Sequence, residues 1–295
     1  AEGYISSEAM SSLPGANAPL DGVGALDFEL ATERSQALTA ALLRAWPEQD
    51  SSRVDAFDQW CATQPWLEDH VRFVVLHQQH GDAWWTWPSS LAQHHSGALQ
   101  QWAAEHAEQL LEERLLQWHL DRQWQAIHAL AKDLGIQLFG DVPFYVSSDS
   151  ADVWSHRHLF TVEADGRLTT QSGVPPDYFS ETGQLWGSPV YRWGRHRLSR
   201  FRWWRQRIGR QLQLVDLLRL DHFRALAGYW AVPGGDSTAQ NGSWEPSPGR
   251  SLLTKLRQDC GGNLPLIAED LGVITPDVEA LRDDFALPGM KVLQF

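Results

Sequence analysis

Apolar residues that recur every three or four positions lie on one face of an α-helix and predict that element. Two early groups have this spacing: Leu38, Leu42, Leu43 and Trp46, then Trp66, Val71, Val74 and Val75. A long helix is predicted over about residues 98–134, with one apolar face formed by Leu111, Leu115, Trp118 and Ile127. Gly135 follows it, and glycine readily takes the left-handed backbone that ends a helix. Residues 26–134 are therefore predicted to be mainly helical, after 25 irregular residues rich in Ser, Gly, Ala and Pro.

The pattern changes after Gly135, where apolar runs of strand length alternate with helical stretches. The runs cover residues 137–146, 215–221, 264–269 and 290–295. Helices are predicted at about 199–213 and 250–260, and a third begins with Thr275 as its N-cap and Pro276 in its first turn. Repeated helix–strand units predict an α/β fold with a parallel sheet, and periodicity leaves open whether that sheet closes into a barrel.

The chain is therefore expected to have two parts, a mainly helical subdomain over residues 1–134 and an α/β part over residues 135–295. Only four parallel strands are predicted, half the number in a (β/α)8 barrel. The last of them runs to the final residue, with no turn or polar tail behind it. We therefore expect this sequence to be the central portion of a longer chain.

Composition and charge narrow the function. The 295 residues include 16 Trp but only 5 Tyr, and the net charge is −13. Negative charge disfavours nucleic acid and anionic membranes as partners and suits a neutral ligand. Most of the Trp are expected in the core, but their planes also suit stacking on the apolar faces of pyranose rings.

Other classes of site have little support. The two cysteines, Cys61 and Cys260, are far apart and lack metal-binding spacing, which favours a reducing cytoplasm. No apolar stretch approaches the length of a membrane span and no secretion signal is visible. Glycine motifs for nucleotides are missing, and Asp149 with Asp152 lacks the rest of a calcium loop. No metal and no cofactor are expected.

An arginine and a carboxylate stand at the end of the predicted strand 215–221. Arg219 and Asp221 are two residues apart, so they lie on one face of the strand. A neighbouring guanidinium favours the ionised carboxylate and fixes its orientation, as a nucleophile requires. A structural ion pair is the commoner explanation of this motif when it occurs alone.

A second carboxylate, Glu269, closes the next predicted strand. Active sites of barrels form at such carboxyl ends, and retaining glycosidases use two carboxyl groups about 5 Å apart. One attacks the anomeric carbon as an anion, and the other carries a proton because burial and its anionic neighbour raise its pKa. Asp270 points the other way and is expected to make a structural hydrogen bond on the helix side.

Two further features accompany this pair. Gly140-Asp141-Val-Pro143 interrupts a strand, which predicts a bend that either aims Asp141 at a ligand or closes a turn. Residues 173–193 form a long segment with glycines, prolines and five aromatic residues, and long loops of this kind are commonly functional. Their aromatic side chains are expected to stack on a ligand or to dock on another part of the protein.

Together these segments resemble the 4-α-glucanotransferase (amylomaltase) family. The matching strings are GDVPFYV (140–146), DSADVW (149–154), GVPPDYFS (173–180), GQLWG (183–187), LDHFR (220–224) and LIAEDLGVI (266–274). Upstream, residues 84–88 and 122–124 resemble the helical insertion of that family. The resemblance covers about residues 60–295 and is weak before residue 60.

The resemblance implies a (β/α)8 TIM-type barrel with a mainly helical N-terminal insertion. By motif position, Asp221 would be the nucleophile and Glu269 the acid/base. Arg219 would position Asp221, while Asp141 and His222 would hold the sugar before the cleaved bond. The family's flexible loop over the acceptor groove would contain Asp177, Tyr178, Phe179, Gln184 and Trp186. A third acidic residue and the first barrel strands would lie outside this chain.

The activity this implies is transfer of α-1,4-glucan segments between maltooligosaccharides by two displacements at the anomeric carbon. An amylase-type hydrolase would use water as the acceptor, and a noncatalytic glucan-binding protein is an alternative of another class. The segment 173–193 favours transfer, because an apolar lid excludes water from the intermediate. A binding module has no need of Arg219, Asp221 and Glu269 together.

Overall fold

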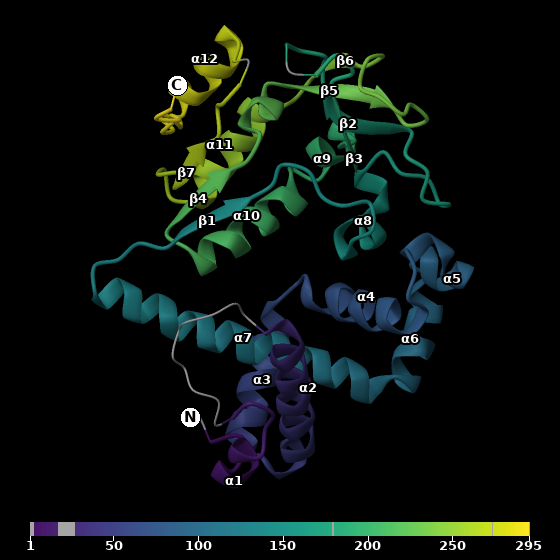
Figure 1. The fold of residues 1–295 in the computed structure, drawn as a ribbon, viewed down its shortest axis with the longest axis vertical. Helices are drawn as coiled ribbons and strands as arrows, with labels where there is room; N and C mark the ends of the chain where they lie inside the picture. The colour runs from purple at the N-terminus through teal and green to yellow at the C-terminus, as the bar shows by residue number, and fades with distance from the viewer. Residues whose placement is uncertain (1–2, 17–26, 179, 273, 295) are drawn as a thin grey trace. The chain divides into compact units, whose positions relative to one another are not determined.

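A computed structural model describes residues 3–16, 27–178, 180–272 and 274–294. The chain forms two compact units, a helical unit of Ala1–Gly81 with Ser96–Gln123 and an α/β unit of Asp82–His95 with Trp124–Phe295 (Figure 1). Helix α7 (Ala107–Asp133) contributes residues to both. The domain boundary between residues 134 and 135 stays a prediction, and compactness divides the chain at other positions.

The helical unit packs its helices around aromatic side chains. It contains α1 (Ser7–Ser11), α2 (Phe28–Ala45), α3 (Ser51–Thr63), α4 (Leu67–His80), α6 (Ser96–Glu105) and the first part of α7. Helices α2 and α3 begin after Asp27 and Asp50, whose carboxylates accept hydrogen bonds from backbone N–H groups of the first turn. The buried residues of one core cluster are Tyr4, Phe57, Leu115 and Trp118.

Helix α7 ends as the sequence predicts. Gly135 adopts φ +70°, and the N–H of Ile136 donates to the carbonyl of Ala131 at 2.8 Å, which closes the last turn. The predicted helix over residues 98–134 is wrong in one respect, because α6 and α7 are separate helices. Ile127 is 54% exposed and does not share the buried face of Trp118. Trp118 and Ile127 are nine positions apart, which is about two and a half turns of helix, so they lie on opposite faces.

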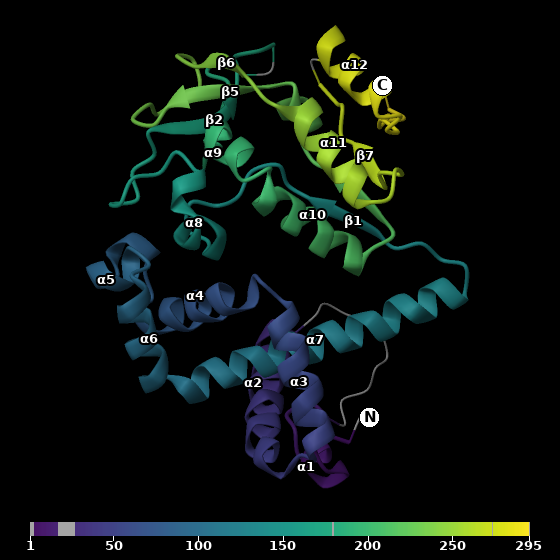
Figure 2. The same ribbon diagram turned by 180° about the vertical axis from the view of Figure 1, so that it is seen from behind.

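The parallel sheet of the α/β unit has the order β1-β4-β7. Its strands are β1 (Phe139–Val142), β4 (Leu217–Leu220) and β7 (Leu266–Ala268). Helix α10 (Arg202–Leu214) leads into β4, α11 (Gly249–Asp259) leads into β7, and α12 (Pro276–Asp284) follows it. The predicted helix–strand units over these residues are confirmed. In Figures 1 and 2, α10 lies along β1 and β4, which it contacts.

The fourth predicted strand is wrong over its described part, because residues 290–294 form no strand. The carbonyl of Pro288 accepts a hydrogen bond from the N–H of Ala268 at 2.8 Å, so the segment starts beside β7. The N–H of Met290 then turns to the carboxylate of Asp270. An apolar run becomes a strand only where a ladder of backbone partners continues.

A second, antiparallel sheet has the order β3-β2-β5-β6 and was not predicted. Its strands are β2 (Thr170–Val174), β3 (Gln184–Pro189), β5 (Gly228–Pro233) and β6 (Ser243–Pro246). Residues 173–193 are therefore not a loop throughout, since they include the end of β2 and all of β3. Gly183 adopts φ +67° where a Cβ would meet the carbonyl of Val174, so the turn between these strands requires glycine.

Short helices complete the fold. They are η1 (Trp46–Glu48), η2 (Trp84–Thr86), α5 (Ser89–Ala92), α8 (Ala151–Ser155), η3 (Arg157–Leu159), α9 (Trp193–Leu198) and η4 (Phe223–Leu226). Eight of the 16 Trp are buried: Trp84, Trp87, Trp102, Trp118, Trp154, Trp193, Trp203 and Trp204. Among the described residues, Trp186 on β3 and Trp244 on β6 are the two tryptophans with an exposed side chain, and both lie on the antiparallel sheet.

Candidate active site

The register of the parallel sheet brings the candidate residues to one edge. Asp141 on β1 lies directly beside Arg219 on β4. One residue past each strand end, the N–H of Asp221 donates to the carbonyl of Val142 at 3.0 Å. The N–H of Glu269 donates to the carbonyl of Leu220 at 3.1 Å, so the ladder continues through both carboxylate residues. Asp221 and Glu269 therefore occupy neighbouring positions at the carboxyl ends of adjacent strands.

Arg219 holds two carboxylates at once. One terminal nitrogen lies 2.8 Å from Asp141 Oδ1 and the other lies 2.6 Å from Asp221 Oδ1. Burial works against the charge of Arg219, but the hydrogen bond with Asp141 and the negative charges nearby outweigh it and raise its pKa. The planar guanidinium fixes both carboxylates in one arrangement, which a lysine could not do.

Glu269 is held by backbone donors rather than by a cation. Its Oε2 accepts from the N–H of His222 at 2.9 Å, and its Oε1 accepts from the N–H of Leu271 at 3.2 Å. His222 adopts φ +54°, a left-handed conformation that is uncommon for a residue with a side chain. The turn after β4 thus sets the position of the carboxylate after β7.

The ring of His222 faces the aromatic side chains of other elements. Its centroid lies 4.8 Å from that of Trp186, edge to face, and 6.1 Å from that of Tyr145. Burial and the charge of Arg224 lower the pKa of His222 to about 4, so the imidazole is neutral at pH 7. Its buried Nε2 has no hydrogen-bond partner among the residues that the structure describes.

The predicted loop residues have different surroundings. Trp186 is 40% exposed, and its Nε1 donates to Gln184 Oε1 at 3.3 Å, so these two lie together on β3. The carboxylate of Asp177 accepts from the N–H of Ser180 at 2.9 Å and closes a turn. Tyr178 in that turn is 96% exposed. Phe179 lies outside the described residues.

Tyr145 belongs to the same cluster and was missed from the sequence. Its ring lies 5.9 Å from Trp186 and stacks with Tyr191, and its buried hydroxyl has no hydrogen-bond partner in the described part of the chain. It follows the GDVPF string within an apolar run, where it resembles ordinary core. Only the polar break just before it could have drawn attention to this position.

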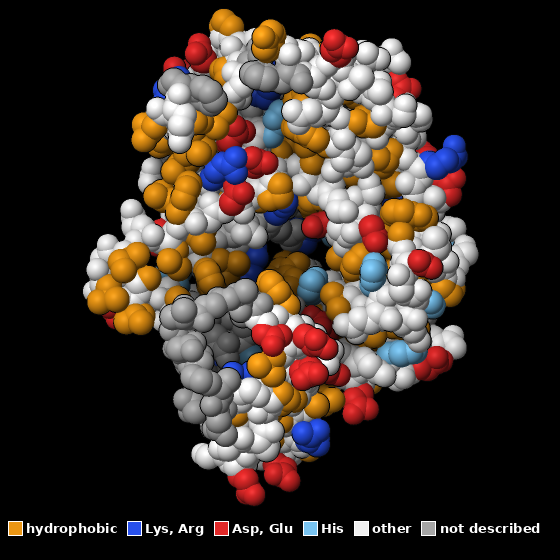
Figure 3. Space-filling view, viewed as in Figure 1, with side chains coloured by type: hydrophobic (Ala, Val, Ile, Leu, Met, Phe, Trp, Pro, Cys, Tyr) orange, Lys and Arg blue, Asp and Glu red, His pale blue; other side chains and the backbone are white. Residues whose placement is uncertain are grey.

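Asp270 makes the structural contacts that the sequence predicts. Its carboxylate accepts from Arg282 at 2.6 Å and from the N–H of Met290 at 2.7 Å, and its side chain is only 6% exposed. In the upper part of Figure 3, acidic and basic side chains lie together with a histidine, where Figure 1 places the ends of β1 and β4. Among residues 3–16, 27–178, 180–272 and 274–294, no group of three or more His, Cys, Asp or Glu could hold a metal ion.

Comparison of this sequence with known proteins identifies the family of the chain. A family model described as 4-alpha-glucanotransferase, of glycoside hydrolase family 77, matches residues 6–295. This chain belongs to that family. The 4-alpha-glucanotransferase of Synechocystis sp. is 43% identical over 265 residues, which are 89% of this chain and 52% of that protein. The Thermus thermophilus 4-alpha-glucanotransferase is 47% identical over 231 residues, 78% of this chain and 46% of that protein.

Solved structures agree with this family. The amylomaltase from Streptococcus agalactiae in complex with acarbose superposes with a TM-score of 0.87 at 31% identity, covering 100% of this chain and 59% of that one. This chain spans about half the length of the curated relatives it matches. No helix in its described part is long and apolar enough to cross a membrane.

Proposed function

We propose that this chain carries the nucleophile and the acid/base of a retaining 4-α-glucanotransferase that acts on α-1,4-glucans. The observation that carries the proposal is the pair of carboxylates at adjacent strand ends, one clamped by Arg219 and the other held by backbone N–H groups. The arginine fixes Asp221 through one oxygen, Oδ1, which leaves the other oxygen to act as the nucleophile. Backbone donors orient a carboxyl group that must first give and then take a proton.

The reaction has two displacements. An oxygen of Asp221 attacks the anomeric carbon as its bond to the leaving glucan breaks, and the proton of Glu269 passes to the leaving oxygen. The product is a glycosyl ester on Asp221. A hydroxyl of a second glucan then attacks the same carbon, Glu269 takes its proton, and Asp221 leaves as a carboxylate. Both bonds at the anomeric carbon form with inversion, so the α configuration is retained.

The neighbouring side chains suit a sugar. Asp141 and the neutral imidazole of His222 would bind hydroxyl groups before the cleaved bond, and the unpaired His222 Nε2 provides one such contact. Trp186 offers an exposed ring for stacking, with Gln184 beside it. We assign Asp177, Tyr178 and Phe179 to the acceptor side as part of the same proposal. The related amylomaltase structure contains acarbose, a pseudo-oligosaccharide, which supports glucan-like ligands.

The fold proposal is that β1, β4 and β7 belong to a (β/α)8 barrel, with residues 1–134 as a mainly helical insertion subdomain. The parallel register and the polar residues at the carboxyl ends support it. Transfer rather than hydrolysis is favoured by one observation. Trp186, His222 and Tyr145 form an aromatic cluster whose member His222 also contacts Glu269, and an apolar wall of this kind disfavours water as the acceptor.

Labelling of the nucleophile tests this function. We would prepare Glu269→Gln in a protein extended on both sides to the length of the relatives and treat it with an activated glucosyl fluoride. A covalent glucosyl adduct should accumulate on Asp221, detected by intact mass and peptide mapping. Asp221→Asn should abolish both the adduct and turnover of maltotriose. The matched control is Asp259→Asn, which alters another arginine-paired carboxylate. An adduct on Asp141 or on another residue would contradict the assignment.

A further inference from the structure

The antiparallel sheet carries a cavity that the proposed reaction does not use. It has a volume of about 380 Å³, within the range of roughly 300–1,000 Å³ for small-molecule sites. Strands β2, β5 and β6 form most of its wall. The register pairs Tyr229 with Glu245 and Ala231 with Ser243, so these residues share the face that lines the cavity. Thr170 on β2 joins them opposite Pro233.

The lining is rich in hydroxyl groups and almost without charge. Its hydrogen-bonding side chains include those of Thr169, Thr170, Tyr229, Asn241, Ser243 and Glu245. No Lys, Arg or His is among the residues that line it, which disfavours an anion. A single carboxylate is too few ligands for a metal ion. Hydroxyl, amide and carboxylate groups around one tyrosine ring suit a neutral ligand that carries many hydroxyls.

Tyr229 has unused hydrogen-bonding capacity. The residue is only 9% exposed, and its hydroxyl makes no hydrogen bond to another residue in the described ranges. Burial, with the charge of Glu245, raises the pKa of Tyr229, so the phenol keeps its proton and can donate. The ring is held in the sheet while the hydroxyl stays accessible from the cavity, so a ligand there can accept a hydrogen bond from it without displacing a protein partner.

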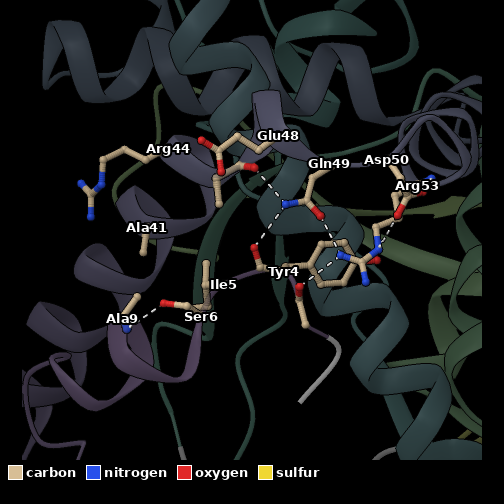
Figure 4. A pocket seen from close by; sticks show the side chains of 12 residues that line it. Tyr4, Ile5, Ser6, Ala9, Ala41, Arg44, Glu48, Gln49, Asp50 and Arg53 are labelled. Carbon is tan, nitrogen blue, oxygen red and sulfur yellow. Dashed lines mark hydrogen bonds and ion pairs between the residues drawn. The ribbon is translucent and has the colours of Figure 1, made fainter.

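A larger hollow in the helical unit provides the contrast. It measures about 680 Å³, and the polar groups around it bond to one another (Figure 4). The amide of Gln49 donates to the carbonyls of Tyr4 and Ala45, and Arg53 donates to Gln49 and to the carbonyl of Gly3. In the cavity on the sheet, Ser243 donates to Glu245 and Asn241 donates to Asp236. The hydroxyl of Tyr229 differs from these groups, because it makes no hydrogen bond within the described ranges.

We propose that the cavity on β2, β5 and β6 is a second sugar-binding site, which holds a segment of α-glucan away from the carboxylates. The choice of an α-linked glucan rests on the proposed function, while a neutral sugar follows from the lining itself. Trp186 lies on β3 at one edge of the sheet, and β6 with Ser243 and Glu245 forms the other edge. A long glucan bound here would be retained between successive transfers, because one chain would contact two sites.

Binding and turnover are measured on the extended protein. Ser243→Arg should block the cavity, and Tyr229→Phe should remove one donor without changing the ring. By calorimetry with maltoheptaose, Ser243→Arg should lose one of two binding sites, and Tyr229→Phe should weaken that site about three- to tenfold. Asp221→Asn should keep it. The control is Ser237→Arg, which adds the same charge at an exposed serine outside the lining.

Turnover separates this inference from the proposed function. Both cavity variants should lower the initial rate on long amylose at limiting concentration while leaving the rate on maltotriose unchanged, because maltotriose is too short to reach both sites. Unchanged maltoheptaose binding in Ser243→Arg and Tyr229→Phe would overturn the inference. Equal binding of the β-linked cellohexaose would overturn the assignment to α-glucan. A wild-type protein that binds maltoheptaose in the cavity but does not convert maltotriose would refute the proposed function alone.

Discussion

The arginine clamp gives the sharpest prediction. Arg219→Met removes both hydrogen bonds to Asp141 and Asp221, while Arg219→Lys keeps a positive charge that can reach only one carboxylate well. In the proposed mechanism, the negative charge of Asp221 passes into the new ester bond as this residue attacks. A cation beside it therefore does not favour attack by charge alone, and the value of the clamp should be geometric.

The expected magnitude follows from that geometry. A misplacement of about 1 Å in a reacting group costs on the order of 10²-fold in rate. The side chains of Asp141 and Asp221 are 59% and 41% exposed, so solvent screens any direct electrostatic gain. We therefore expect Arg219→Met to lose about 10²-fold in kcat, or about 2.7 kcal/mol, with a smaller change in KM. Arg219→Lys should recover less than tenfold of that loss.

The assay is glucose release and chain-length redistribution from maltotriose by the extended protein. Arg205→Met is the matched control, because Arg205 makes an equally short two-point ion pair with Asp259 outside the site. It should keep kcat within about twofold of the wild type. Full activity of Arg219→Lys would show that charge and not orientation matters. Full activity of Arg219→Met would show that the hydrogen bonds from Arg219 to the two carboxylates are not needed for the reaction.

Three smaller predictions follow. Trp186→Ala should raise the ratio of hydrolysis to transfer on maltotriose, whereas Trp186→Phe should change it less, because a ring still excludes water. Asp270→Ala should lower the free energy of unfolding in urea by about 3 kcal/mol. Burial raises the pKa of Asp270, but bonds from Met290 and Arg282 outweigh it and lower it, so this stability is present at neutral pH and lost in acid, below pH about 4. Burial raises the pKa of Cys61 to about 11, so iodoacetamide should label it slowly at pH 8.

The geometry at the parallel strand ends could be predicted because it depends on local rules. Arg219 and Asp221 share a face through the two-residue period of one strand, and the hydrogen bond between them is found. Glu269 was placed by the rule that parallel strands end at the same edge, and the register bears this out. The roles of these residues in catalysis stay predictions.

The antiparallel sheet could not be predicted for a physical reason. β3 contains Gly187 and Pro189, which weaken a strand, and it forms as an edge paired only with β2. β6 is exposed along its whole length and has no apolar alternation to indicate it. Both strands form because pairing with the neighbouring strands stabilises them, although their own residues have a weak preference for β-structure.

His222 was named as a sugar ligand from its motif, but its backbone role was hidden from the sequence. A left-handed backbone conformation at a residue with a side chain, such as His222, costs on the order of 1–2 kcal/mol. The neighbouring sequence has no pattern that predicts this conformation. Here the conformation directs the N–H of His222 to Glu269, and the ring turns towards Trp186. Glycine would relieve the strain and would lose the ring.

His222 connects the two sheets of the α/β unit at the candidate site. Asp221 and Glu269 are fixed by the parallel sheet, while Trp186 is fixed by the antiparallel sheet. His222 contacts both sides, through its backbone to Glu269 and through its ring to Trp186. A shift of either sheet would therefore move a carboxylate and an aromatic wall together. In the proposed mechanism, this coupling would keep the aromatic wall at a fixed distance from Asp221, so that water is excluded while the glycosyl ester exists.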